Sequence, residues 1–305
     1  MREPYEYKPP AELVKHASAL CGRRGEEWLD DLPEIVGGLE KAWGVTVGEP
    51  FGKGEFNFVA PARSPNGMDA VLKIAPPYER TEIFAEAAFL RSRAGNTCIN
   101  LLREDRSRRA ILIERARPGL SMDVQFEAGP FTCVEPAIRV LRSVLSATPA
   151  NIADVQYLDN WFDHFKRFRE TDFPKNYGEK ALAIYEKLRQ QHDRIFYLHG
   201  DFHPGNIVTS DRGPFLTIDP KGLIGHVSYD IAVFLNNLHW WQKGKPGVDR
   251  ELDAALIKFS RAFDCPESTL REAAYAYMVI GAWWNFEDMP EHYDNEVALA
   301  DIWGI

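Results

Sequence analysis

The stretch that decides the fold reads His199-Gly-Asp201-Phe-His-Pro-Gly-Asn206, and a second carboxylate, Asp219, follows thirteen residues after the asparagine. A short apolar run, Pro214–Ile218, leads into that second carboxylate. Phosphoryl transfer requires these side chains. One carboxylate positions the attacking hydroxyl and receives its proton, while an amide and another carboxylate hold Mg²⁺ on the phosphates. The pattern therefore predicts a phosphoryl-transfer site.

An ordinary turn is the competing interpretation of the same eight residues, since Asp and Asn satisfy their own backbone groups and Gly adopts positive φ. The position of Asp219 favours the catalytic interpretation over the turn. Asn206–Thr209, a Ser-Asp-Arg-Gly turn and Phe215–Ile218 have the pattern of a β-hairpin, which would return Asp219 to the end where Asn206 stands. One Mg²⁺ ion could contact both side chains, because it leaves its other positions to water and phosphate. The spacing His-x-Asp-x4-Asn is that of kinase catalytic loops.

Length and charge are those of a globular chain with a small or cationic partner. The 305 residues can bury a substantial core in two lobes. A net charge of −9 disfavours a nucleic-acid-binding surface.

The four cysteines form no Cys-x-x-Cys pair, so neither a zinc knuckle nor a disulfide framework is indicated. The beginning of the chain lacks the apolar core of a signal peptide, and the apolar stretches at 231–241 and 276–284 are too short to span a bilayer. We expect a cytoplasmic protein with no membrane partner.

Hydrophobic periodicity divides the chain near Pro118-Gly119. Before this point it predicts helices over 11–20 and 26–43, the second interrupted at Pro33, and then a helix inserted among strands: Phe56–Ala60, Asp69–Ile74, Glu79–Arg91 (the helix), Ile99–Arg103 and Ala110–Glu114. After it, helices are predicted over Pro136–Ser146, Ala153–Arg169, Tyr177–His192, Tyr229–Trp240, Arg250–Phe263 and Ser268–Phe286. The predicted fold class is α+β and bilobal. A small antiparallel-sheet N-lobe (1–116) precedes a mainly helical C-lobe (117–305) that carries the catalytic loop and the acceptor site.

A glycine-containing turn is the first candidate nucleotide contact. Gly52-Lys-Gly54-Glu-Phe-Asn57-Phe-Val59 matches the kinase pattern Gly-x-Gly-x-x-Gly-x-Val, except that Asn57 replaces the last glycine. Backbone amides of Gly52 and Gly54 could approach phosphates because no Cβ intervenes. Asn tolerates left-handed geometry. A plain hairpin turn is the alternative, and a P-loop is not indicated because no Walker A sequence is present.

A lysine inside an otherwise apolar strand is the second candidate, since Lys73 in Ala70-Val-Leu-Lys73-Ile needs a partner or a ligand. We expect it to reach phosphate oxygens and to be oriented by Glu86 on the following helix. Glu82, one turn earlier, is the competing partner, and a solubilising edge-strand lysine is the structural alternative. Further along, backbone groups near Glu114 and Ala116 would face an adenine if this strand leads into a hinge.

The acceptor is predicted to be a small molecule, because only ten residues separate Asp219 from Asp230, too few for the segment that presents a peptide in protein kinases. Asp230 opens an apolar helix, where a carboxylate suits the dipole or could anchor the catalytic loop. The stretch 286–305 has acidic residues and no Lys or Arg. It suits either a solvated tail or, with Trp283, Trp284, Phe286 and Trp303 interleaved, a cationic ligand.

With these motifs in place, the chain resembles the aminoglycoside phosphotransferase family, and within it the branch of streptomycin 6-phosphotransferases and hydroxyurea-resistance kinases. The likeness covers most of the chain: Glu26–Pro33, Ala70–Lys73, Ile113–Gly119, His199–Asn206 and Ile218–Gly225. The run Asp219-Pro-Lys-Gly222 is the most specific to the branch. The resemblance implies a protein-kinase-like fold, ATP and Mg²⁺ as cofactors, and phosphorylation of a hydroxyl on a small, cationic, streptomycin-like substrate.

The resemblance also implies a role for each residue. Asp201 would be the catalytic base, Asn206 and Asp219 the metal ligands, and Lys73 with Glu86 the phosphate clamp. His199 and Asp230 are expected to give structural support to the loop. Two other functions stay open: a metabolic kinase of an amino alcohol or sugar, and a nucleotide-binding pseudokinase. Retention of the base, the metal ligands and the lysine together argues against the pseudokinase.

Overall fold

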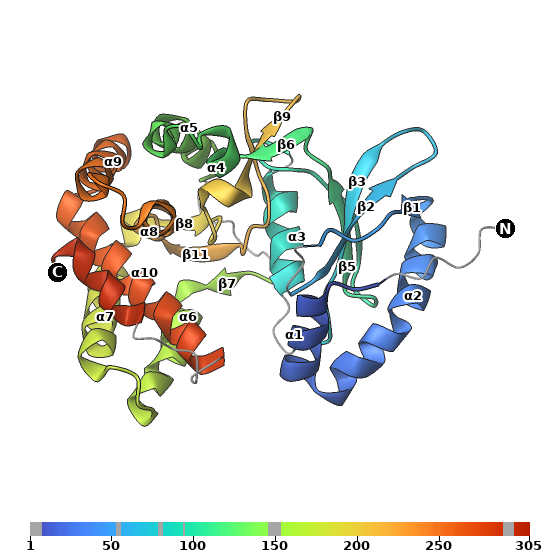
Figure 1. Ribbon diagram of the computed structural model, residues 1–305, viewed down its shortest axis with the longest axis horizontal. Helices are drawn as coiled ribbons and strands as arrows, with labels where there is room; N and C mark the ends of the chain where they lie inside the picture. Colours follow the sequence, from blue (N-terminus) through green and yellow to red (C-terminus); the bar gives the residue numbers. More distant parts are fainter. Residues whose placement is uncertain (1–7, 53–55, 79–81, 94, 146–153, 289–295) are drawn as a thin grey trace. The chain divides into compact units, whose positions relative to one another are not determined.

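The computed structural model describes residues 8–52, 56–78, 82–93, 95–145, 154–288 and 296–305. The chain divides into two compact units, Met1–Gly119 and Leu120–Ile305. Figure 1 labels most of their helices and strands along the chain.

The first unit is built on a five-stranded antiparallel sheet in the order β1-β2-β3-β5-β4. Its strands are β1 (Thr46–Val47), β2 (Phe58–Arg63), β3 (Asp69–Ile74), β4 (Leu101–Asp105) and β5 (Ala110–Glu114). Its helices are α1 (Ala11–Cys21), α2 (Arg23–Trp43) and α3 (Glu82–Arg93). The bounds of β3 and β5 are those predicted from the sequence, whereas β2 and β4 each begin two residues later.

Period-two alternation along β3 divides its side chains between the two faces of this sheet. Ala70, Leu72 and Ile74 belong to a core cluster shared with α1 and α2, so these two helices cover one face. The intervening Lys73 contacts Glu86 of α3 instead, which places α3 at the other face. The sheet thus has an apolar side that stabilises the unit and a side that carries the buried lysine.

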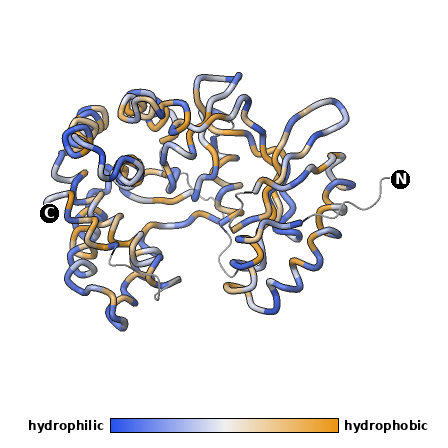
Figure 2. The backbone as a smooth tube through the Cα atoms, in the orientation of Figure 1, coloured by the Kyte–Doolittle hydropathy of each residue, from blue (hydrophilic) through white to orange (hydrophobic). Residues whose placement is uncertain are grey.

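Helix α2 continues through Pro33, which corrects the interruption predicted there. A proline in a helix loses one backbone hydrogen bond and crowds the preceding turn. The apolar stripe that includes Trp28, Leu32, Val36 and Leu39 is buried on both sides of the proline, and this burial offsets the local cost. Hydrophobic and hydrophilic residues alternate along this helix (Figure 2).

The second unit is mainly helical and holds two small three-stranded sheets, β10-β9-β6 and β7-β11-β8. Its helices are α4 (Met122–Gln125), α5 (Val134–Val144), α6 (Leu158–Phe165), α7 (Lys175–Leu188), α8 (Ser228–Gln242), α9 (Val248–Phe263) and α10 (Glu267–Asp288). Short 3₁₀ segments are Pro130–Cys133, Lys166–Glu170, His192–Arg194, Pro204–Asn206 and Glu296–Trp303. The strands are β6 (Pro118–Ser121), whose first two residues belong to the first unit, β7 (Gln156–Tyr157), β8 (Ile195–Leu198), β9 (Ile207–Ser210), β10 (Leu216–Thr217) and β11 (Leu223–His226). Among the described residues, no helix has the length and apolar character needed to cross a membrane.

The single helix predicted over Ala153–Arg169 is wrong. Ala153 lies outside the described residues, and the remainder forms β7, α6 and the 3₁₀ segment Lys166–Glu170. Strand β7 pairs in parallel with β11, Gln156 opposite Leu223. A partner so distant in sequence leaves no trace in local periodicity, so this strand could not be recognised from the sequence.

Trp283 and Trp303, near the end of the chain, are core residues, so the alternative in which their faces meet a cationic ligand is wrong. Both side chains are buried. The indole Nε1 of Trp303 donates to Asn236 Oδ1 of α8 at 2.9 Å. The neighbouring acid Glu287 accepts a hydrogen bond from Arg167 at 2.7 Å. These residues therefore join the last segment of the chain to the helices of the second unit.

Candidate active site

The loop that carries the sequence motif follows β8 and is anchored by Asp230, in the first turn of α8. The Asp230 carboxylate is fully buried. Its Oδ2 accepts from the backbone N–H of His199 at 2.9 Å, and its Oδ1 accepts from that of Gly200 at 2.7 Å. Gly200 has a φ of 81°, and a Cβ there would lie 2.9 Å from the Leu223 side chain. The loop can therefore take this course only with glycine beside the anchoring carboxylate.

His199 links the same loop to the strand that precedes Asp219. Its ring Nδ1 accepts from the Asp201 backbone N–H at 3.3 Å, and its Nε2 lies 3.0 Å from the carbonyl oxygen of Ile218. A carbonyl can only accept, so the Nε2 carries the proton. Burial lowers the pKa of His199 to about 3. The ring is thus a neutral structural link between the two parts of the motif.

Asp201, the candidate base, keeps its carboxylate within reach of solvent, with 27% of the side chain exposed. The side-chain nitrogen of Asn206 donates to its backbone carbonyl oxygen at 3.0 Å and to its Oδ2 at 3.2 Å. The Oδ1 lies 3.9 Å from His203 Nε2. These contacts orient the carboxylate without covering it, as a general base requires.

The predicted hairpin is formed by β9 and β10, with Ile207 opposite Thr217. One residue further along, the Ile218 N–H donates to the Asn206 carbonyl oxygen at 3.0 Å. Asn206 and Asp219 therefore stand at the same end of the hairpin, as the sequence predicts. Asp219 has a φ of 56°, an uncommon conformation for a residue other than glycine and one that clusters at functional sites.

The donor set at this end of the hairpin fits a magnesium ion. The Asn206 amide nitrogen is bound to Asp201, so its oxygen is the end available to a cation. Asp219 adds a carboxylate oxygen, and Mg²⁺ prefers such oxygen ligands while keeping several waters. No group of three or more His, Cys, Asp or Glu side chains suited to a metal occurs among the residues described, so a site for a more demanding metal is not indicated there.

Lys73 and Glu86 form a buried ion pair in the first unit. The Lys73 Nζ donates to Glu86 Oε2 at 2.7 Å, and the two residues are only 6% and 3% exposed. Strand β3 lies between β2 and β5, so the solubilising edge-strand lysine is excluded. Glu82, the competing partner predicted from the sequence, is exposed at the start of α3. Such a pair can hold a lysine in a fixed position against phosphate oxygens.

The remaining nucleotide contacts predicted from the sequence have different surroundings. Gly52 is exposed, whereas Gly54 lies outside the described residues. Glu114 is engaged with Asn100, since its N–H donates to the Asn100 carbonyl oxygen and its carboxylate accepts from the Asn100 N–H, both at 2.8 Å. Ala116 follows β5, and its backbone N–H has no hydrogen-bond partner among the described residues.

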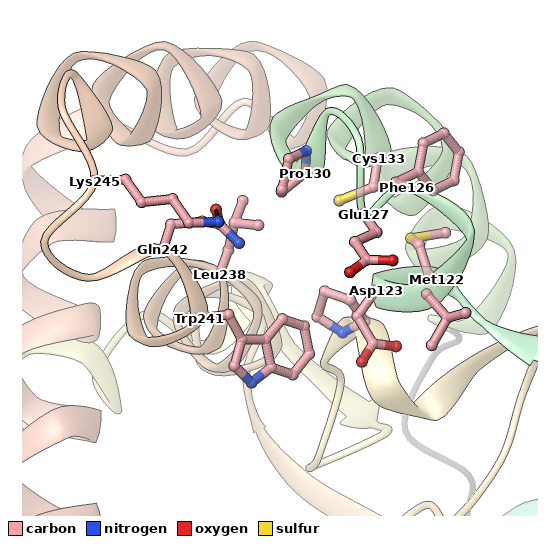
Figure 3. Close-up of a pocket in the computed structure, with 12 residues that line it drawn as sticks. Met122, Asp123, Phe126, Glu127, Pro130, Cys133, Leu238, Trp241, Gln242 and Lys245 are labelled. Carbon is pink, nitrogen blue, oxygen red and sulfur yellow. Dashed lines mark hydrogen bonds between the residues drawn. The ribbon is translucent and has the colours of Figure 1, made fainter.

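Sequence reasoning missed a pocket of about 340 Å³ in the second unit, lined in part by Asp123, Glu127 and Trp241 (Figure 3). Pro204 of the catalytic loop also lines it. The available signal was the run Met122-Asp-Val-Gln-Phe-Glu127, in which acids flank an aromatic residue. That this run and Trp241 line the same pocket is visible only in the folded chain.

An antiparallel-sheet unit followed by a helical unit with this loop is characteristic of phosphotransferases with a protein-kinase-like fold. Residues 45–289 match the family model described as aminoglycoside/hydroxyurea antibiotic resistance kinase, and the chain belongs to that family. The family membership, the fold class and the kinase class predicted from the sequence are thereby confirmed.

Individual relatives span nearly the whole chain. It is 27% identical over 303 residues to a hydroxyurea phosphotransferase of Kitasatospora aureofaciens, covering 96% of this chain and 85% of the relative. It is 27% identical over 309 residues to a streptomycin 6-kinase of Streptomyces glaucescens, covering 92% and 91%. A solved structure of an amicoumacin kinase in complex with AMP-PNP, Ca²⁺ and Ami shares the fold, with a TM-score of 0.63 at 15% identity, covering 92% of this chain and 95% of that one.

Proposed function

We propose that the protein transfers the γ-phosphate of ATP to a hydroxyl group of an aminoglycoside-type antibiotic such as streptomycin. The observation that carries this proposal is the Asp201 carboxylate, which is oriented by Asn206 in a loop anchored on Asp230 and still meets solvent. A loop built only as a turn would not need a buried carboxylate and a buried neutral histidine to fix one partly exposed aspartate.

In the proposed reaction, Asp201 accepts a hydrogen bond from the acceptor hydroxyl and receives its proton as that oxygen bonds to the γ-phosphorus. The bond from phosphorus to the bridging oxygen breaks, and ADP leaves. The proton then passes from Asp201 to solvent. Asn206 and Asp219 would hold Mg²⁺, which neutralises charge on the phosphate oxygens when bound.

Lys73 is assigned to the phosphate oxygens of ATP, with Glu86 keeping its ammonium group in place. Glu114 and Ala116 are assigned to the adenine through their backbone groups, and Gly52 and Gly54 to the phosphates. The Ala116 N–H is the better-supported adenine donor, because that of Glu114 already donates to Asn100.

The short segment between Asp219 and Asp230 supports a small-molecule acceptor. Only the loop before β11, the strand itself and Val227 precede α8, in which Asp230 is already buried, so this part of the chain offers no long segment to present a peptide. The name of one relative, a streptomycin 6-kinase, and the net charge of −9 support a cationic antibiotic, whereas another relative is named for hydroxyurea. A metabolic kinase of an amino alcohol or sugar would use the same residues and differ only in the acceptor.

The test is ADP release from Mg-ATP with purified protein and a panel of acceptors: streptomycin, other aminoglycosides, hydroxyurea, choline-like amino alcohols and sugars. Asp201→Asn is expected to lower kcat about 10²- to 10⁴-fold, the usual contribution of a general base. Asp211→Asn is the matched control, because Asp211 is exposed in the turn between β9 and β10.

Streptomycin-dependent turnover that is lost in Asp201→Asn and kept in Asp211→Asn would support both the acceptor class and the base. Turnover only with an amino alcohol or a sugar would indicate a metabolic kinase instead. If Asp201→Asn bound ATP and left every activity unchanged, the catalytic assignment would be wrong and the pseudokinase would be favoured.

A further inference from the structure

The pocket beside the catalytic loop is formed entirely within the second unit (Figure 3). Asp123 of α4 and Glu127, just after that helix, stand on one side of it. Trp241 and Gln242, at the end of α8, stand on the other. Its volume of about 340 Å³ is enough for one ring of a small molecule with its substituents.

Asp123 lines this pocket and carries an unsatisfied acceptor. Its Oδ1 is buried and has no hydrogen-bond partner among the residues that the structure describes. Burying a carboxylate oxygen without a donor costs free energy, so turning this half-buried carboxylate toward a pocket ligand that brings a donor is favoured. Glu127 supplies a second carboxylate on the same side. These two carboxylates can accept hydrogen bonds, so this side of the pocket suits an N–H donor that carries positive charge.

Trp241 and the net charge of the lining residues also favour a positively charged group. Indole is the best of the aromatic faces for a cation. Lys245 is the one ammonium group among the lining residues described, and its Nζ donates to Gln242 Oε1 at 2.8 Å. Two carboxylates against one ammonium leave the lining with a net negative charge. A guanidinium or ammonium group fits such a pocket better than a phosphate or a carboxylate.

The pocket is also next to the candidate base. Pro204, which lines it, follows directly after His203 in the catalytic loop. The His203 ring meets Trp241 edge to face with 6.1 Å between ring centroids, and its Nε2 lies 3.9 Å from Asp201 Oδ1. A single histidine side chain thus stands between the indole and the base. A substrate of two or three rings could place one cationic substituent here and a hydroxyl at Asp201.

We propose that Asp123, Glu127 and Trp241 form a subsite that binds a guanidinium or ammonium group of the hydroxyl-bearing acceptor and selects cationic over neutral acceptors. This inference rests on the proposed function, because it assigns part of the acceptor to this pocket. The three residues lie outside the catalytic motif.

The test compares Asp123→Asn, Glu127→Gln and Trp241→Leu with Glu170→Gln, an exposed glutamate of the same unit outside the pocket. The full chain is assayed for ADP release with streptomycin, which carries guanidinium groups, and with hydroxyurea, which is neutral. We expect Asp123→Asn and Glu127→Gln each to raise the KM for streptomycin about tenfold, the loss of roughly one charged hydrogen bond. Trp241→Leu should raise it about fivefold through loss of the cation–π contact. The KM for ATP and the KM for hydroxyurea should stay unchanged, as should every constant of Glu170→Gln.

A second measurement separates failure of this subsite from failure of the proposed function. Streptomycin is titrated calorimetrically into the full chain loaded with Mg²⁺ and AMP-PNP. Weaker binding in the pocket variants supports the subsite even if no turnover occurs, in which case only the proposed reaction is lost. If the KM and the dissociation constant for streptomycin equal those of the wild type in all three variants, and Asp201→Asn is inactive, the proposed subsite is wrong. The proposed function is then still supported. Thermal unfolding of Trp241→Leu, with Trp241→Phe beside it, shows whether the loss comes from the indole or from misfolding.

Discussion

The side-chain nitrogen of Asn206 donates to both the backbone carbonyl oxygen and the carboxylate of Asp201, at 3.0 and 3.2 Å. The candidate base and one candidate metal ligand therefore fix each other. With its donor end occupied, the Asn206 amide presents its oxygen away from Asp201, which is the orientation that a cation needs. Asp219 stands at the same end of the hairpin, one residue beyond the Ile218 N–H that donates to the Asn206 carbonyl oxygen.

Replacing Asn206 should therefore affect the metal and the base together. We expect Asn206→Ala to raise the Mg²⁺ concentration for half-maximal ADP release by about 10- to 100-fold and to lower kcat. A magnesium titration of turnover measures both. Asn160→Ala is the control, because Asn160 is exposed on α6 and remote in sequence from the loop. An unchanged magnesium requirement in Asn206→Ala would remove Asn206 from the metal site.

The buried pair of Lys73 and Glu86 should contribute to both stability and activity, and the two effects can be separated. Removing one partner leaves the other charge buried, so Lys73→Met should lower the free energy of unfolding by about 3–5 kcal/mol. Lys73→Met/Glu86→Leu removes both charges and should regain most of that loss. Activity should remain low in both, because no ammonium group reaches the phosphates.

Urea unfolding and ADP-release kinetics measure these two effects in parallel. Lys41→Met is the control, since Lys41 is exposed near the end of α2. If the double variant regained its ATP KM and kcat along with its stability, Lys73 would have a structural role only.

The catalytic loop could be predicted from the sequence because its determinants are local. The spacing from Asp201 to Asn206 fixes one turn, and the Ser-Asp-Arg-Gly turn returns the chain to Asp219, so no distant contact is needed to bring the groups together. Lys73 could be found for a similar reason. A lysine among apolar strand residues is costly unless it is paired, and Glu86 lies on the next helix.

Features that depend on distant contacts could not be predicted. Strand β7 exists only because β11 pairs with it, and α2 continues through Pro33 only because the sheet buries its apolar stripe. The burial of Trp303 depends on Asn236, which lies in another helix. The pocket joins Asp123 to Trp241, more than a hundred residues later. Local periodicity contains none of these relations.

Two glycines of α2 provide a matched pair of stability predictions. A Cβ at Gly25 would collide with the carbonyl oxygen of Ala17 in α1, whereas a Cβ at Gly37 would meet no atom within 4 Å. Gly37→Ala should stabilise the chain by about 0.5–1 kcal/mol, because alanine loses less backbone entropy in a helix. Gly25→Ala should destabilise it by about 1–3 kcal/mol, the usual cost of overpacking. Urea unfolding of both variants measures the difference, and equal effects would mean that α1 does not pack closely on α2 at Gly25.

The buried His199 should make stability depend on pH in a defined window. Its pKa is lowered to about 3 by burial, whereas in the unfolded chain it lies near 6.5. Between these values the unfolded state binds more protons, so stability falls as the pH falls, and above pH 6.5 the contribution is complete. His199→Gln should flatten the slope of the free energy of unfolding in this window by up to about 1.4 kcal/mol per pH unit. Urea unfolding at several pH values measures it, with the exposed His192 replaced in His192→Gln as control. Equal slopes in the two variants would mean that His199 is not held neutral by its burial within the catalytic loop.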